Sequence, residues 1–480
     1  MRATLRRSCD ACAKAKHRCD LRTPRCSRCS KRKASCVYAN APLTSSPDAE
    51  DASCESSASS TPAARSEEAV GGRDVSVVSR FSDNSVALVN PADASFDPFD
   101  SYPPTRLPRI HVQRLIHNFL SNIAFQYYPL DLDLASNPFV VSWWPLALED
   151  PALFHVSLQT ASLDEELRAQ NGFPISGLLM ADSVSLVRQK IEHSSLAFQD
   201  GTLNSVVTLA AIEHGKGNVQ TTRMHIDGVK RMVGVRGGIN QLKRSSPLTA
   251  RMVAWVSMLV TGVPQFETQD DVGFGDGIGP IFQWQLTSTG PDPQQRILDE
   301  LQVDPALSDI LARLRNIFHE PQLSRLTSTE LHDLTCFVVH KLLLLPPFSL
   351  ADPKISAISE CLRYTTVLYM LIIHGTTYYS HADLATTMIY QLKTHLQVLA
   401  GTTHVDSPLG LWTLSIGMAT TTGSTEYQWF TKQACTAAMT RSLQTWEDVL
   451  MRLESIFWMR PQEGELFRQR WEEALNMTKK

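Results

Sequence analysis

Residues 9–36 read CDACAKAKHRCDLRTPRCSRCSKRKASC and hold six of the ten cysteines in this 480-residue chain. The stretch consists of two halves that repeat one spacing, C-x2-C-x6-C. Cysteines spaced this regularly serve either as metal ligands or as a disulfide framework. Six cysteines would suit three disulfides, so their number alone does not choose between the two.

The arithmetic of coordination favours metal. A structural zinc takes four ligands in a tetrahedron, and each half supplies three thiolates. Six sulfurs suffice for two zinc ions when two sulfurs bridge both metals. The N-terminal MRATLRRSCD is basic and lacks the apolar run of a signal peptide, so we expect a reducing compartment, where such thiols bind metal more often than they pair. The sequence predicts two structural Zn²⁺ ions held by Cys9, Cys12, Cys19, Cys26, Cys29 and Cys36.

Positive charge is concentrated around these cysteines. Residues 1–40 contain twelve Lys and Arg and two acidic residues, whereas the other 440 residues contain 33 basic and 47 acidic ones. Two zinc ions on six thiolates would still leave this segment at about +8. Such a charge density in a small module is typical of proteins that bind the phosphate backbone of double-stranded DNA.

With this spacing and a proline, Pro24, in the loop that joins the halves, the segment resembles the fungal Zn(II)2Cys6 binuclear-cluster transcription factors. The resemblance implies a small module of two short helix–loop repeats over residues 1–40. It also implies the division of the ligands. The bridging sulfurs would belong to Cys9 and Cys26, and the terminal pairs would be Cys12 with Cys19 and Cys29 with Cys36.

In that family the first helix enters the major groove, and basic residues after the second cysteine read a CGG triplet. A cation can hydrogen-bond O6 and N7 of guanine, which is why a basic side chain suits this base. The family commonly has basic residues at the first, third, fourth and sixth places, which here hold Ala13, Ala15, Lys16 and Arg18. With small residues at the first and third places, the segment resembles regulators of the aflatoxin-pathway type more closely than those with the R-x-R-K form. We expect Lys16 to read bases, Arg18 to hold phosphate and the half-site to be a shorter CG-centred sequence.

The remaining cations of the module are Lys14, an extra charge in the second place, and those of the second half. By the resemblance, Arg28, Lys31, Arg32 and Lys33 would contact the DNA backbone and serve nuclear import. Pseudo-symmetry between the halves offers base reading as one alternative for the last three, and a merely solvated charge run is another. The predicted DNA-binding set is Lys14, Lys16, Arg18, Arg28, Lys31 and Lys33.

Residues 41–107 are dominated by Ser, Ala, Pro and acidic residues, which favours a disordered linker. No heptad pattern follows the cysteines, so the protein either binds DNA as a monomer or forms a homodimer through its C-terminal domain. Within the linker, Phe96, Phe99 and Tyr102 alternate with acidic residues. They fit either an activation peptide that docks on transcriptional co-regulators or a segment that packs onto the following domain.

Residues 108–480 are predicted to form an all-α domain. Apolar residues recur with helical spacing at Leu203, Val206, Val207 and Ala210, and again at Ile226, Val229, Met232 and Val233. Further helices are predicted near residues 331–346, 355–375, 382–400, 430–440 and 444–458. Residues 180–400 resemble the fungal-specific transcription factor region, in which a helix ends in R-G-G, here Arg236-Gly237-Gly238. The resemblance implies a regulatory and interaction domain.

Nothing in the sequence predicts an enzyme. The chain lacks G-x-S-x-G, H-E-x-x-H and G-x-x-x-x-G-K-[ST] motifs. The glycine-rich GFGDGIGP (residues 273–280) looks like a nucleotide-binding loop. An ordinary loop is favoured, because no clear strand precedes it and Pro280 interrupts the next turn. Single histidines such as His214, His225 and His340 are expected in core or surface roles, and Cys336, Cys361 and Cys435 as packing thiols. No stretch of about eighteen apolar residues predicts a membrane span.

Together these features predict a nuclear, sequence-specific transcription factor of RNA polymerase II genes that reads a short CG-containing half-site. Family analogy adds the expectation that it regulates a secondary-metabolite gene cluster. Two alternatives stay open. One is a zinc-cluster co-regulator that works by protein contact without sequence-specific DNA recognition. The other is a helical enzyme or small-molecule receptor that carries the zinc module as an accessory.

Overall fold

The structure is a computed structural model that describes residues 10–15, 27–32, 102–127, 133–287, 295–319, 326–348, 353–375, 381–399, 407–454 and 464–478. The chain divides into two compact units, Met1–Ser82 and Asp83–Lys480. The described residues are largely helical and include no strand; one isolated bridge pairs Thr268 with Ile278. The cysteine-rich segment and the all-α region predicted from the sequence thus fall in different units.

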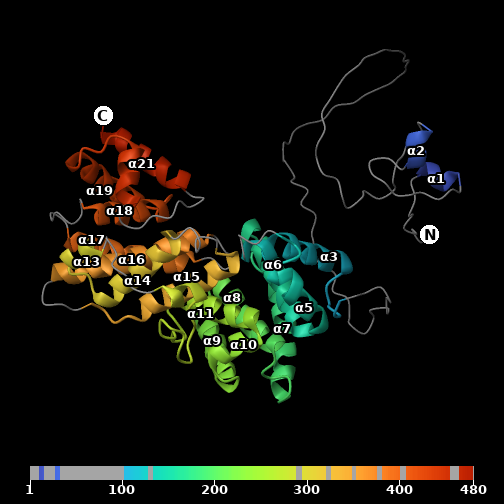
Figure 1. The fold of residues 1–480 in the computed structure, drawn as a ribbon. Coiled ribbons are helices and arrows are strands. Elements are labelled where there is room, and N and C mark those ends of the chain that lie inside the picture. Colours follow the sequence, from blue (N-terminus) through green and yellow to red (C-terminus); the bar gives the residue numbers. More distant parts are fainter. Residues whose placement is uncertain are drawn as a thin grey trace, which may run out of the picture. The chain divides into compact units, whose positions relative to one another are not determined.

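Figure 1 shows the helices in chain order. The first unit contains α1(Asp10–Lys14) and α2(Ser27–Lys31). The second begins with α3(Arg109–Asn118), η2(Phe119–Ile123), α4(Ala124–Tyr127), η3(Phe139–Trp143), α5(Trp144–Glu149), α6(Pro151–Ala169), α7(Pro174–Glu192), α8(Asp200–Gly215), α9(Val219–Val235), α10(Gly238–Ser245) and α11(Pro247–Thr261). It continues with α12(Phe282–Leu286), α13(Gln295–Glu300), α14(Pro305–His319), α15(Ser328–Leu344), α16(Pro353–His374), α17(Ala382–Val398), α18(Pro408–Thr420), α19(Glu426–Thr440), α20(Trp446–Glu454) and α21(Gly464–Thr478).

Helix α8 is the centre of the N-terminal half of the second unit. It packs against α6, α7, α9 and α11 and is therefore enclosed on several sides. The predicted apolar residues Leu203, Val206, Val207 and Ala210 are buried, as expected. Its polar residues over 202–205 and at 208 are buried as well, because no face of this helix is left to solvent.

Helix α9 has the one-sided burial that its sequence predicts. Ile226, Val229, Met232 and Val233 are at most 8% exposed, while the intervening residues are exposed or half-buried. The helix ends at Val235, directly before the predicted stop signal. Gly237 and Gly238 have φ angles of 86° and 91°, in the left-handed region that favours glycine, and α10 begins at the second of them.

Helix α16 organises the C-terminal half and contacts α14, α15, α17 and α18. By length and composition alone this helix could cross a membrane. However, 78% of its apolar window is buried by neighbouring helices. A long apolar helix that its neighbours cover in this way is typical of the core of a helical domain.

Local signals fix where several helices begin. The Asp150 side chain accepts hydrogen bonds from the backbone N–H groups of Ala152 and Leu153, at 3.0 and 3.3 Å, and so caps α6. Thr327 and Glu330 form a reciprocal capping box at the start of α15. Such caps satisfy the otherwise unpaired donors of the first helical turn.

The packed part of the second unit begins before residue 108, the boundary that the sequence predicted. Leu107 is buried, and the rings of Tyr102 and Phe154 stack with centroids 5.6 Å apart. The Arg106 guanidinium pairs with Asp182 on α7 at 2.6 Å. The structure thus supports the packing alternative at Tyr102, whereas Phe96, Phe99 and the other residues of 41–101 lie outside the described residues.

The glycine-rich segment is a loop, as predicted. Asp271 accepts hydrogen bonds from Trp284 Nε1 and Lys341 Nζ, both at 2.8 Å, and anchors the loop to α12 and α15. Gly277 lies against the backbone of residues 267–268, where a Cβ atom would overlap it. Gly277 therefore serves close backbone packing in this loop.

Candidate zinc cluster and regulatory domain

The two described helices of the first unit occupy the same place in each cysteine repeat. Helix α1 begins one residue after Cys9 and α2 one residue after Cys26, and the two helices are in contact. Each closes a turn through backbone bonds, from Ala15 N to Ala11 O at 3.2 Å and from Arg32 N to Arg28 O at 3.1 Å. The repeat in the sequence is therefore also a repeat in the backbone.

Burial separates the two chemistries of these helices. Cys12 and Cys29, third in their helices, are 2% and 3% exposed. Lys14 and Lys31, fifth in their helices, are exposed, and Arg28 is half-buried. In each half, a sulfur thus points into the module two residues before a cation that remains in solvent.

This arrangement fits a zinc cluster. The module is too short and too polar for an apolar core, so a metal core accounts for two buried thiols better than packing does. Sulfur ligands in every position would leave no open site for chemistry, which suits a structural metal. Four other predicted ligands, Cys9, Cys19, Cys26 and Cys36, lie outside the described residues.

Three predicted DNA-binding residues also lie outside the described residues: Lys16, Arg18 and Lys33. Of that set the structure describes Lys14, Arg28 and Lys31. Lys14 and Lys31 are at equivalent positions at the ends of α1 and α2. This equivalence matches the pseudo-symmetry that the sequence predicts between the two halves.

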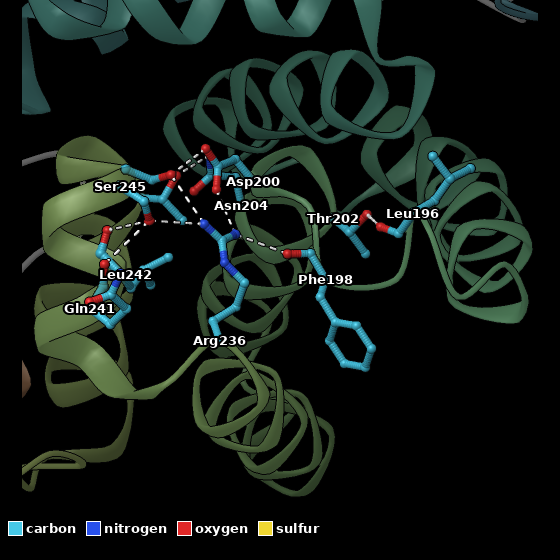
Figure 2. A network of polar contacts seen from close by, with 11 residues as sticks. Leu196, Phe198, Asp200, Thr202, Asn204, Arg236, Gln241, Leu242 and Ser245 are labelled. Carbon is cyan, nitrogen blue, oxygen red and sulfur yellow. Dashed lines mark hydrogen bonds and ion pairs between the residues drawn. The ribbon is translucent and has the colours of Figure 1, made fainter.

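In the second unit, the R-G-G cue marks a polar junction between three helices. Figure 2 shows the Arg236 guanidinium between the start of α8 and the end of α10. Nη1 donates to the Phe198 carbonyl at 2.9 Å and to Asp200 Oδ1 at 2.8 Å. Nη2 donates to the hydroxyls of Ser245 at 3.1 Å and Ser246 at 3.3 Å. One side chain thus ties the end of α9 to both neighbouring segments.

Ser246 closes the junction by donating to Asp200 Oδ2 at 2.6 Å. The Arg236 side chain is 22% exposed and that of Asp200 is 35% exposed, so the ion pair is partly shielded from water. The sequence offered Arg236 as a marker of the family region. It gave no sign of the acceptors, which lie up to 38 residues away in the chain.

A second polar link connects α10 and α11 with α15. Asp333 accepts hydrogen bonds from Arg251 Nε at 2.8 Å and Nη2 at 3.0 Å, and Lys243 Nζ lies 3.2 Å away. Burial opposes ionisation of Asp333, but these cations outweigh it and lower its pKa. The carboxylate therefore stays charged and holds the three helices together.

The buried histidines have core roles, as predicted for His340. Its Nδ1 lies 2.7 Å from the Cys336 carbonyl, so this nitrogen carries the proton. Burial lowers the pKa of His340 to about 4. His332 and His374 contact each other at 3.0 Å and both rings pack against Trp255. Among the residues that the structure describes, no group of His, Cys, Asp and Glu is arranged to hold a metal.

The other single residues also fall into surface or packing roles. His214 is 31% exposed and its Nε2 lies 3.2 Å from an Asp383 oxygen, while His225 is half-buried. Cys336 and Cys361 are buried, and burial raises the pKa of the Cys336 thiol to about 12. A thiol with such a pKa is protonated and inert at neutral pH. Cys435 is half-buried.

Comparison with protein families finds one match in each unit. Residues 7–45 match the fungal Zn(2)-Cys(6) binuclear cluster domain, and residues 114–262 match the fungal specific transcription factor domain. No curated protein and no solved structure matches the chain. Both matched families are fungal transcription-factor domains, which are not enzymes. The cluster domain binds two zinc ions as structural cofactors.

The second match runs from α3 to Gly262, the residue that ends α11. It includes the R-G-G junction, but it begins earlier and ends earlier than the range of about 180–400 suggested by the sequence. Everything from α12 onward lies beyond the matched region. The family assignment therefore leaves the function of the C-terminal helices open.

Proposed function

We propose that this protein binds double-stranded DNA sequence-specifically and regulates genes transcribed by RNA polymerase II in the nucleus. The observation that carries the proposal is the pairing, in each repeat, of a buried cysteine with an exposed lysine two residues later. A metal core would fix the helix, and the helix would present its cation to a groove. Proteins with this cluster domain bind DNA, which supports the proposal.

The contacts follow from the side-chain chemistry. Lys16 is assigned to guanine O6 and N7 in a short CG-containing half-site, because it occupies the family's basic fourth place after Cys12. Arg18 and the exposed Lys14 and Lys31 are assigned to phosphates, together with Arg28 and Lys33. Phosphate contacts position the module, whereas the base contact supplies sequence preference.

The domain plan that accompanies this function has three parts. Residues 1–40 form the DNA-binding domain, residues 41–107 the linker, whose last residues from Tyr102 already pack on the helical unit, and residues 108–480 the regulatory domain. Homodimerisation through the helical domain, contact with co-regulators and control of a secondary-metabolite gene cluster complete the proposal. They rest on the absence of a heptad pattern after the cluster and on family analogy.

Selection from random duplex DNA tests the proposal directly. Full-length zinc-loaded protein and a fragment of residues 1–60 are selected side by side. We expect both to enrich a CG-centred motif, and paired motifs from the full-length protein alone would support dimerisation through the helical domain. Salt-sensitive binding without any enriched motif would refute sequence recognition and favour a co-regulator that acts by protein contact.

A further inference from the structure

A cavity of about 900 Å³ lies in the C-terminal half of the second unit, beyond the family match. Its described lining comes from the ends of α16 and α18, the start of α19 and the length of α17. Ligand sites in proteins commonly have volumes of about 300–1,000 Å³. The cavity is therefore large enough for an organic molecule.

The apolar part of the lining offers a surface for a hydrophobic ligand body. It consists of Leu371, Ile372, Ala385, Ile389 and Ala419. Burying a ligand against these side chains would remove apolar surface from water on both sides, which is the main source of affinity in such sites.

The polar part of the lining contains a group of threonine acceptors beside donors such as Lys393 and Gln397. Four threonine hydroxyls line the cavity, and each donates its one hydrogen to a carbonyl of its own helix. The bonds run from Thr386 to Ala382, Thr394 to Tyr390, Thr420 to Ile416 and Thr421 to Gly417, at 2.7–2.9 Å. A hydroxyl whose hydrogen is engaged still has a free lone pair. A ligand that pairs with these four hydroxyls must therefore bring hydroxyl or N–H donors.

The charged part of the lining does not select a charged ligand. Lys393 and Glu426 both line the cavity. Hydrogen bonds, chiefly from the Thr425 side chain, lower the pKa of the Glu426 carboxyl, and the charge of Lys393 lowers it further. Their opposite charges compensate each other. The described lining thus carries no net charge, which favours a neutral ligand over an ion of either sign.

Two of the helices that line the cavity, α16 and α17, also contact helices of the family-matched region. On the last turn of α16, Ile372 lines the cavity, and His374 lies about 200° around the helix and packs against Trp255 of α11. At the start of α17, Ala382 lines the cavity, and the next residue, Asp383, contacts His214 of α8. An occupant would therefore touch two helix ends that contact the matched region directly.

We propose that this cavity is an effector site for a neutral, largely apolar organic molecule that carries hydroxyl or N–H donors. The site does not depend on the DNA-binding function, so its test stands by itself.

Bisphenol A and its dimethyl ether are suitable probes, because they share an apolar body and only the first has donors. Titration calorimetry of the full-length, zinc-loaded protein should give one saturable site for bisphenol A. We expect at least tenfold weaker binding of the dimethyl ether. Equal affinities for the two probes, or no saturable binding of either, would overturn the proposal.

Neighbouring threonines provide matched variants. Thr386 lines the cavity, and Thr387 does not; both are exposed and both donate to their own helix. Thr386→Phe should weaken bisphenol A binding at least tenfold, and Thr387→Phe should leave it unchanged. An equal effect of both substitutions would overturn the assignment. The conservative pair Thr386→Val with Thr420→Val should reduce the preference over the dimethyl ether and decides the matter if Thr386→Phe does not fold.

Hydrogen exchange tests the effector role. Bisphenol A should slow amide exchange at the C-terminal end of α8 and in α11 of the wild-type protein, and Thr386→Phe should abolish this change. Binding without altered exchange at α8 and α11 would overturn the effector role.

Discussion

Replacing Arg236 by alanine should destabilise the helical unit by about 2–3 kcal/mol. The substitution removes four hydrogen bonds that link α9 to the start of α8 and to the α10–α11 junction. A partly exposed ion pair contributes up to about 1 kcal/mol, and the other three bonds contribute about 0.5 kcal/mol or more each. Arg236→Lys should lose about 1–2 kcal/mol, because one ammonium cannot reproduce a fork that spans both segments.

Urea denaturation followed by circular dichroism measures these losses in the free energy of unfolding. The comparison requires that each variant has the m-value of the wild type. Arg231→Ala is the matched control, since Arg231 is exposed on the same helix and its side chain donates to Asp227 O of that helix at 3.2 Å. A double-mutant cycle with Asp200→Asn should give a coupling energy of about 1 kcal/mol. The reasoning is refuted if Arg236→Lys unfolds like the wild type or if the cycle shows no coupling.

Four further outcomes are expected. Lys16→Ala should cost about 1–3 kcal/mol on the preferred DNA site and blur its central bases, as measured by repeated selection; an unchanged motif would exclude it as the base reader. Cys26→Ser should release both zinc ions, and two zincs per chain by mass spectrometry would remove it from the bridge. Gly417→Ala would overlap a phenylalanine ring of α19 and should destabilise by about 1–3 kcal/mol in urea, whereas Gly234→Ala, with open space around it, should not. Because burial lowers the pKa of His340 to about 4, stability should fall as pH drops from about 6.5 towards 4; the decline should be shallower in His340→Leu, and an identical pH profile would contradict this.

The sequence predicts a helix well where one face is buried and the other is solvated. Helix α9 is such a case, and both its apolar face and its glycine stop are where the pattern places them. Helix α18 was missed, because residues 409–419 are buried all round and leave no period to detect. Helix α8 shows the intermediate case: its apolar rhythm is real, but packing on several sides also buries its polar residues.

The candidate sites also differ in how far the sequence alone predicts them. The six cysteines are close in sequence, and their spacing carries the prediction of a zinc cluster without any knowledge of the fold. The partners of Arg236 and the walls of the cavity are brought together only by tertiary packing. No local pattern connects Thr386 on α17 with Thr420 on α18, so neither the cavity nor its preference for donors could be anticipated.

The burial of Cys12 and Cys29 has a consequence for the chemical lifetime of the protein. Thiolates react with oxidants and alkylating agents in proportion to their accessibility. With 2–3% of their surface exposed, these sulfurs become targets only when α1 and α2 move apart. The fraction of time that the helices spend apart, together with the concentration of the reagent, would then set how long the protein keeps its zinc ligands in a cell under oxidative stress.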